Sequence, residues 1–138
     1  MITWLMDTAL CKMLASPRAT NLQQWCEVNN ASLFLSAATL TEVAAALGKI
    51  PGSQSQRRDV LRKWLDNLTS RFADRIHEID LAISIRAGAI LPQLTTGHQR
   101  HRFHDAVLVA TAQAHGHGLL TCRDAIFGAW TQTPIAVI

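Results

Sequence analysis

Short apolar runs typical of buried strands alternate along this chain with segments whose apolar residues recur at helical spacing. The runs that favour strands lie at 1–7, 32–36, 76–79, 118–121 and 134–138. The helical segments lie at 10–14, 19–28, 39–47, 56–68, 80–92 and 104–114. Such alternation predicts an α/β sandwich with a mostly parallel sheet.

Length and composition fit one packed domain. The chain has 138 residues, of which 49% are hydrophobic and 17% charged, so it is long and apolar enough for a single core and unlike a disordered chain. We see no internal repeat or linker and expect one domain over 1–138. Since no uncharged apolar stretch reaches about 18 residues, no membrane span is expected.

A cytoplasmic location is also expected. The first residues, Met-Ile-Thr-Trp-Leu-Met-Asp, lack the basic and long apolar regions of a secretory leader. The three cysteines, Cys11, Cys26 and Cys122, are an odd number without CxxC spacing, which suits a reducing compartment. We expect them to be buried packing residues.

Four acidic residues adjoin the apolar runs, namely Asp7, Glu42, Asp105 and Asp124. A carboxylate beside a buried segment costs several kcal/mol unless it is compensated. Ligands of open α/β sheets gather at the carboxyl ends of the strands, where these acids can converge. Because charges about 4 Å apart repel by about 4 kcal/mol at an effective dielectric near 20, we expect a hard divalent cation, Mg²⁺ or Mn²⁺, among them. Such an ion suits phosphodiester hydrolysis, since it activates water and orients phosphate.

Each acid also has a structural interpretation. Thr39-Leu-Thr-Glu42 has the pattern of a capping box, and Asp105 and Asp124 are plausible helix N-caps. Asp7 is harder to explain in this way, because a capping acid seldom ends so apolar a run. The joint pattern favours a site.

These residues resemble the PIN domain family, and within it the small VapC-like toxin ribonucleases of toxin–antitoxin pairs. The similarity covers nearly the whole chain. It rests on Asp7-Thr8 after the leading strand, on Ser36, Thr39 and Glu42, on the Asp-Ala-Val-Leu-Val-Ala helix from Asp105, and on the Gly-Leu-Leu-Thr strand. The resemblance implies a three-layer α/β/α sandwich with a mostly parallel central sheet and RNA cleavage dependent on Mg²⁺ or Mn²⁺. It also implies a small VapB-like antitoxin partner, a homodimer, and Asp7, Glu42 and Asp105 as metal-binding acids.

The fourth motif departs from the family pattern. Arg123 and Ile126 stand where the family generally has an Asn or Asp and often a further acid. Asp124, displaced by one position, is the expected substitute as a metal-binding, catalytic acid. By the same resemblance Thr8 and Thr121 are expected to orient the substrate.

The basic residues add a weaker indication of an RNA partner. A net charge of +3 attracts polyanions only weakly, but Arg100 and Arg102 precede Asp105 and are expected to contact phosphates. Zinc binding by His101 and His104 is not favoured, because they straddle a loop-to-helix junction; we expect surface groups near RNA. Trp64, on an amphipathic helix, is the best interface candidate.

Two other functions stay open. A catalytically silent, PIN-like RNA- or protein-binding regulatory module would explain the irregular fourth motif. A phosphotransfer domain also uses a strand-terminal aspartate as phosphoryl acceptor, although no Asp-x-Asp pair surrounds Asp7.

Overall fold

The central feature of the computed structural model is a parallel sheet of five strands in the order β3-β2-β1-β4-β5. The structure describes residues 2–16, 18–94, 102–122 and 135–137, the last segment by its backbone. All strand pairings are parallel, as predicted. The strands are β1 (Trp4–Met6), β2 (Leu33–Ser36), β3 (Ile76–His77), β4 (Gly118–Thr121) and β5 (Ile135–Val137).

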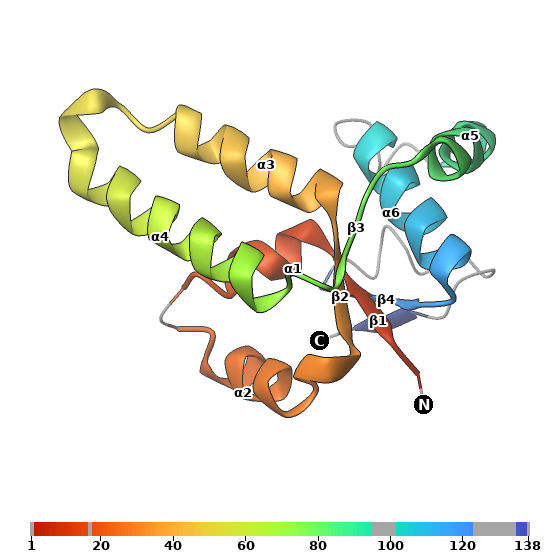
Figure 1. Cartoon of the computed structure of the whole chain (residues 1–138), viewed down its shortest axis with the longest axis horizontal. Helices are drawn as coiled ribbons and strands as arrows, with labels where there is room; N and C mark the ends of the chain where they lie inside the picture. The colour runs from red at the N-terminus through yellow and green to blue at the C-terminus, as the bar shows by residue number, and fades with distance from the viewer. Residues whose placement is uncertain (1, 17, 95–101, 123–134, 138) are drawn as a thin grey trace.

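Helices cover both faces of the sheet, so the expected three-layer α/β/α sandwich is confirmed (Figure 1). The helices are α1 (Thr8–Met13), α2 (Thr20–Val28), α3 (Ala37–Gly48), α4 (Ser55–Arg71), α5 (Leu81–Ile90) and α6 (Arg102–His115). Single 3-10 turns lie at Asn30–Ser32, Gly52–Gln54 and Leu91–Gln93.

Alternation along the strands divides the core in two. Leu5 and Leu119 pack with the apolar residues of α5 and α6, and Phe34 packs against the same cluster. Their neighbours Met6 and Leu120 face the other way, toward α1, α2 and α4. Because successive strand residues point to opposite faces, strands buried on both sides are apolar throughout. The continuous apolar runs of the sequence reflect this double burial.

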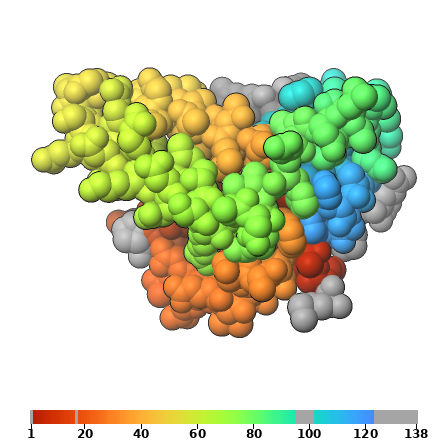
Figure 2. Space-filling view, viewed as in Figure 1, coloured from red at the N-terminus to blue at the C-terminus, as the bar shows by residue number. Residues whose placement is uncertain are grey.

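Helices α3 and α4 run side by side and extend beyond the body of the molecule as an arm (Figures 1 and 2). The turn at Gly52–Gln54 joins them. Arg58 donates to the backbone carbonyl of Ile50 at 2.8 Å and so ties the start of α4 to the end of α3. Helix α4 has 17 residues and extends beyond the predicted segment 56–68 by one residue at its start and three at its end.

The ends of three helices test the capping predictions. Asp80 is the N-cap of α5, as predicted, and accepts a hydrogen bond from the amide of Ile83 at 2.8 Å. Helix α3 begins earlier than predicted, because Ser36 caps it by accepting from the amide of Ala38. At the end of α6, Gly116 has φ +70°, a left-handed conformation that glycine adopts without steric cost.

The expectation that the cysteines are buried packing residues holds for two of the three. Cys11 and Cys26 are buried in the core and Cys122 is half-buried, and all three are free thiols. Among the residues that the structure describes, no helix combines the length and apolar character needed to span a membrane.

Candidate active site

Asp7 lies at the carboxyl end of the central strand β1 with its side chain completely buried. Its amide donates to the carbonyl of Leu120 at 2.8 Å, which continues the β1–β4 pairing by one residue. Its Oδ2 atom accepts a hydrogen bond from the hydroxyl of Thr121 at 2.8 Å. The residue after β1 and the last residue of β4 therefore form a buried polar pair at this edge.

Asp105 is the second fully buried carboxylate. It lies in the first turn of α6, which begins three residues earlier at Arg102. Asp105 is therefore part of the helix, and its interpretation as the N-cap residue is wrong. Because burying a charged group costs free energy unless it is compensated, the full burial of Asp105 makes it a candidate for a functional role.

A chain of hydrogen bonds connects the helices at this edge of the sheet. The hydroxyl of Thr8 at the start of α1 lies 2.7 Å from that of Thr39 on α3 and 2.6 Å from Nε2 of His104 on α6. Thr8 follows Asp7 and His104 precedes Asp105. The Thr8–His104 contact therefore brings the backbone positions of the two buried acids to the same edge.

Glu42 lies on the rim of this network, on α3. Its Oε2 atom is 3.2 Å from the ammonium of Lys12, and its Oε1 atom is 3.8 Å from Nδ1 of His104. Because α3 begins at Ala37, Thr39 is inside the helix and the capping-box interpretation of Glu42 is wrong. The side chain of Glu42 is turned toward neighbouring helices and is 26% exposed.

The donor set suits a hard divalent cation. Carboxylate oxygens are preferred by Mg²⁺ and Mn²⁺, and Mg²⁺ often takes only one or two carboxylates and keeps several waters. Asp7 and Asp105 supply two such buried groups. Within the described ranges, no group of three or more His, Cys, Asp or Glu side chains is arranged to hold a metal ion. Asp7 and Asp105 are described carboxylates whose oxygens are of the kind that such an ion prefers.

Several predicted site residues lie outside the described residues, namely Arg100, Arg123, Asp124 and Ile126. Arg102 is described, and its guanidinium donates to the carbonyl of Leu91 at 2.7 Å, at the end of α5. That contact holds the start of α6 against the preceding turn.

Sequence reasoning missed Lys12 and misjudged His104. The side chain of His104 is only 13% exposed and is part of the hydrogen-bond network, so its interpretation as a surface group is wrong. Lys12 follows Thr8 by four residues on α1, and residues at this spacing share a helix face. That spacing is the signal that would have identified it.

A second polar cluster lies on the α5–α6 side of the sheet. The Nε2 atoms of His77 and His117 are 2.8 Å apart, and His115 stacks on His77 with ring centroids 3.6 Å apart. Phe34 stacks on His117 at 4.3 Å. Burial and the nearby imidazoles of His77 and His115 lower the pKa of His117 to about 4.

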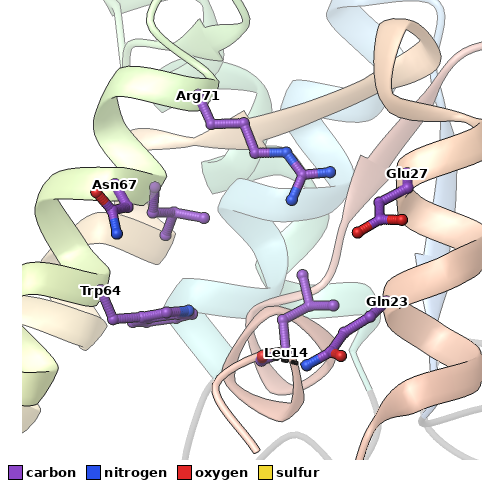
Figure 3. A pocket seen from close by; sticks show the side chains of 7 residues that line it. Leu14, Gln23, Glu27, Trp64, Asn67 and Arg71 are labelled. Carbon is purple, nitrogen blue, oxygen red and sulfur yellow. Dashed lines mark hydrogen bonds between the residues drawn. The ribbon is translucent and has the colours of Figure 1, made fainter. Parts of the chain in front are cut away.

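The pocket of Figure 3 lies between the end of α1, α2 and α4, with none of the candidate site residues in its lining. Arg71 on α4 and Glu27 on α2 point toward one another across it, and the ring of Trp64 forms part of its wall (Figure 3). Trp64 is half-buried here; its role in an interface stays a prediction.

Comparison with known proteins gives a family model and a set of similar folds. The model described as PIN domain matches residues 10–129. Among curated proteins, no sequence matches the chain significantly.

Three solved structures illustrate the similarity. DNA-bound VapBC from Salmonella typhimurium has 16% identity and a TM-score of 0.79, covering 99% of this chain and 98% of that one. VapBC2 from Rickettsia felis bound to a promoter DNA fragment has 14% identity and a TM-score of 0.76, covering 99% of each chain. FitAcB from Neisseria gonorrhoeae has 22% identity and a TM-score of 0.73, covering 96% of each chain. At these identities the likeness shows a shared fold.

Proposed function

The chain belongs to the PIN domain family, and from this premise we propose that it is a metal-dependent endoribonuclease, the toxin of a toxin–antitoxin pair. The observation that carries the proposal is the placement of Asp7 and Asp105, two fully buried carboxylates, on either side of the Thr8–His104 hydrogen bond. Burying two carboxylates costs free energy unless they are compensated, and a bound divalent cation would supply that compensation.

In this proposal Asp7 and Asp105 hold Mg²⁺ or Mn²⁺, with Glu42 and Asp124 completing the acidic set. The bound ion would lower the pKa of a coordinated water and polarise the phosphate. The water oxygen then forms a bond to phosphorus, the bond to the leaving oxygen breaks, and that oxygen takes up a proton. Thr121 fixes the orientation of the Asp7 carboxylate through its 2.8 Å hydrogen bond. Thr8, with hydroxyl contacts to Thr39 and His104, is proposed to orient the substrate.

The proposed partners follow from the same family. RNA is the proposed substrate, with Arg100 and Arg102 contacting its phosphates and a net charge of +3 favouring its approach. We propose a small VapB-like antitoxin as the protein partner, because the chain shares its fold with VapBC and FitAcB structures. A homodimer and a cytoplasmic location belong to the same proposal.

Neutralising one buried acid tests this function. Asp7→Asn should reduce Mg²⁺-stimulated cleavage of a mixed-sequence RNA by at least a hundredfold while the thermal unfolding midpoint stays within a few degrees. Asp59→Asn, on the exposed surface of α4, is the matched control and should cleave like the wild type. Equal cleavage by the Asp7 variant and the wild type would refute the proposal.

The silent regulatory module remains the second candidate, because Arg123 and Ile126 replace the polar and acidic residues usual in the fourth motif. Calorimetric titration with Mn²⁺ separates the two functions. A silent module predicts no detectable binding, whereas a nuclease predicts binding that disappears in the Asp7 variant.

A further inference from the structure

A groove lies between the arm and the end of α1, and we call it the arm groove. Helix α1 lies at the base of the arm (Figure 1). The described residues that line the groove include Ala15, Ser16, Ala46, Arg57, Val60 and Trp64. Its volume of about 500 Å³ is within the range of sites that hold small molecules, so the arm groove is large enough for a ligand.

The arm groove begins about one helical turn from the candidate active site. Lys12 and Glu42 form an ion pair at 3.2 Å that joins α1 to α3 at the rim of that site. The amide of Ala15 donates to the carbonyl of Lys12 at 3.2 Å, and Ala46 follows Glu42 by four residues on α3. Four residues of helix span about 6 Å. An RNA strand with one phosphate at the site can therefore reach the groove with a nearby nucleotide.

The walls of the arm groove are mainly apolar, and the one charged residue among its described lining is Arg57. Val60 is 69% exposed, so its side chain would leave water when the groove is filled. The indole ring of Trp64 is a surface on which any base can stack. The guanidinium of Arg57 donates to the exposed side chain of Gln54 at 3.2 Å, a partner that a phosphate can replace. This lining matches the base and the phosphate of a nucleotide.

Charge distinguishes the arm groove from the pocket of Figure 3, which Trp64 also lines. In that pocket Glu27 faces Arg71, and its carboxylate would repel a phosphate (Figure 3). The segment 49–58 beside the arm groove carries three basic residues and no acidic one. Such a surface attracts polyanions. An apolar peptide would make no use of these charges, so the observations favour RNA as the ligand.

We propose that the arm groove binds a nucleotide that flanks the cleaved bond of the RNA, with its base stacked on Trp64 and its phosphate on Arg57. This inference rests on the proposed nuclease function and adds to it a binding subsite outside the buried acids. Because stacking on an aromatic ring tolerates every base, the groove contributes affinity and register more than sequence selectivity.

Binding of RNA without metal tests the groove separately from cleavage. Anisotropy of a dye-labelled, mixed-sequence RNA of about eight nucleotides, titrated in EDTA, gives the Kd. Trp64→Leu should raise the Kd at least fivefold, whereas Trp64→Phe keeps an aromatic ring and should stay within threefold of the wild type. Arg57→Gln should raise the Kd at least threefold and lower the slope of log Kd against log salt concentration by about 0.7, the value for one phosphate contact.

Arg86→Gln is the matched control, because it removes the same charge from the exposed side of α5. Its Kd should lie within twofold of the wild type, with an unchanged salt slope. Thermal unfolding midpoints should stay within a few degrees for all variants. If Trp64→Leu fails to fold, Arg57→Gln decides, since Arg57 is exposed. With Mg²⁺ present, the KM for the same RNA should rise in proportion to the Kd while kcat stays within threefold.

The outcomes separate this inference from the nuclease function. A Kd within twofold of the wild type for both Trp64→Leu and Arg57→Gln would overturn the inference and leave the nuclease intact. Retained RNA affinity in variants that lose the co-expressed VapB-like antitoxin would assign the groove to a protein partner and overturn it too. The predicted losses of RNA affinity in a chain that cleaves no RNA with Mg²⁺ would support RNA binding in the groove and overturn the proposed function.

Discussion

The Nε2 atoms of His77 and His117 lie 2.8 Å apart, a distance at which one imidazole must donate and the other accept. The other ring nitrogen of His117, Nδ1, lies 2.5 Å from the hydroxyl of Thr3, and His117 is only 6% exposed. The pair is therefore compatible with neutral rings, and protonation of both would place two like charges side by side. Burial lowers the pKa of His77, and it lowers the pKa of His117 to about 4.

We predict that this cluster makes the fold sensitive to acid. The folded-state pKa of His117 lies below the unfolded value of 6.5, so the unfolded chain binds more protons between these values. The stabilisation is fully present above pH 6.5 and is lost as pH falls toward 4. We expect the free energy of unfolding to fall by about 2 kcal/mol across this window, after allowance for coupling between the rings. Urea denaturation at a series of pH values measures it.

His117→Gln should flatten this pH dependence, since it removes the buried titrating ring. His115→Gln is the matched control, because it leaves the His77–His117 pair in place and should retain most of the slope. A wild-type stability that is constant from pH 6.5 to 4 contradicts the prediction.

A side chain at position 118 is predicted to destabilise the protein, because the ring of Trp4 occupies the space beside Gly118. A Cβ atom there would lie 2.4 Å from Cζ3 of Trp4, well inside contact distance. Gly118→Ala should therefore destabilise the protein by about 1–3 kcal/mol through overpacking. In contrast, Gly88→Ala on the exposed face of α5 meets nothing within 4 Å and should stabilise by up to about 1 kcal/mol, because alanine favours helix. Thermal or urea unfolding of both variants measures these changes. Equal free energies of unfolding for Gly118→Ala and Gly88→Ala would contradict the steric argument.

Loss of the Thr121 hydroxyl is predicted to be costly because it leaves a buried carboxylate with one donor fewer. Thr121→Val should reduce the free energy of unfolding at pH 7 by about 1–3 kcal/mol. Thr111→Val removes a buried hydroxyl that donates only to the helical carbonyl of Val107 and should cost less than about 1 kcal/mol. A loss in Thr121→Val below about 0.5 kcal/mol would show that the Thr121–Asp7 hydrogen bond contributes little.

The thiols are predicted to differ in reactivity. Burial, with Cys26 and Asp7 nearby, raises the pKa of Cys11 to about 12, and burial raises the pKa of Cys26. Because the thiolate is the reactive form, both should resist a disulfide reagent at pH 8, and Cys122 should react first. Native protein should show one fast thiol and unfolded protein three. Absence of the fast thiol in Cys122→Ser would confirm the assignment, whereas a fast thiol that persists in this variant would contradict it.

The sequence predicts most of the fold because its helices and strands are buried in different ways. Strands covered on both faces, such as β1 and β4, are apolar without interruption, whereas α4 shows a clear polar face. Asp80 shows that a capping residue followed by an apolar helix is a reliable local signal, since it depends on neighbouring backbone atoms alone.

The candidate site was predictable from the sequence in its acids and, through the family resemblance, in Thr8 and Thr121. Asp7 and Asp105 stand out because charge beside an apolar run is unusual, and the structure buries both completely. The roles of Lys12 and His104 depend on helices that are distant in sequence, so no local pattern indicates that both contact Glu42. The His77–His117 contact is hidden in the same way, with 40 residues between its partners.

Strand β3 is an edge of the sheet and has only two residues, Ile76 and His77. So short an edge offers few unpaired amide and carbonyl groups as a template on which another chain could add a strand. Just before it, Arg75 donates to the carbonyl of Leu33 at 2.8 Å and occupies part of the adjoining backbone. Strand addition by another copy of the chain is therefore disfavoured at this edge of the sheet. An ordered assembly at this edge would depend mainly on side-chain contacts.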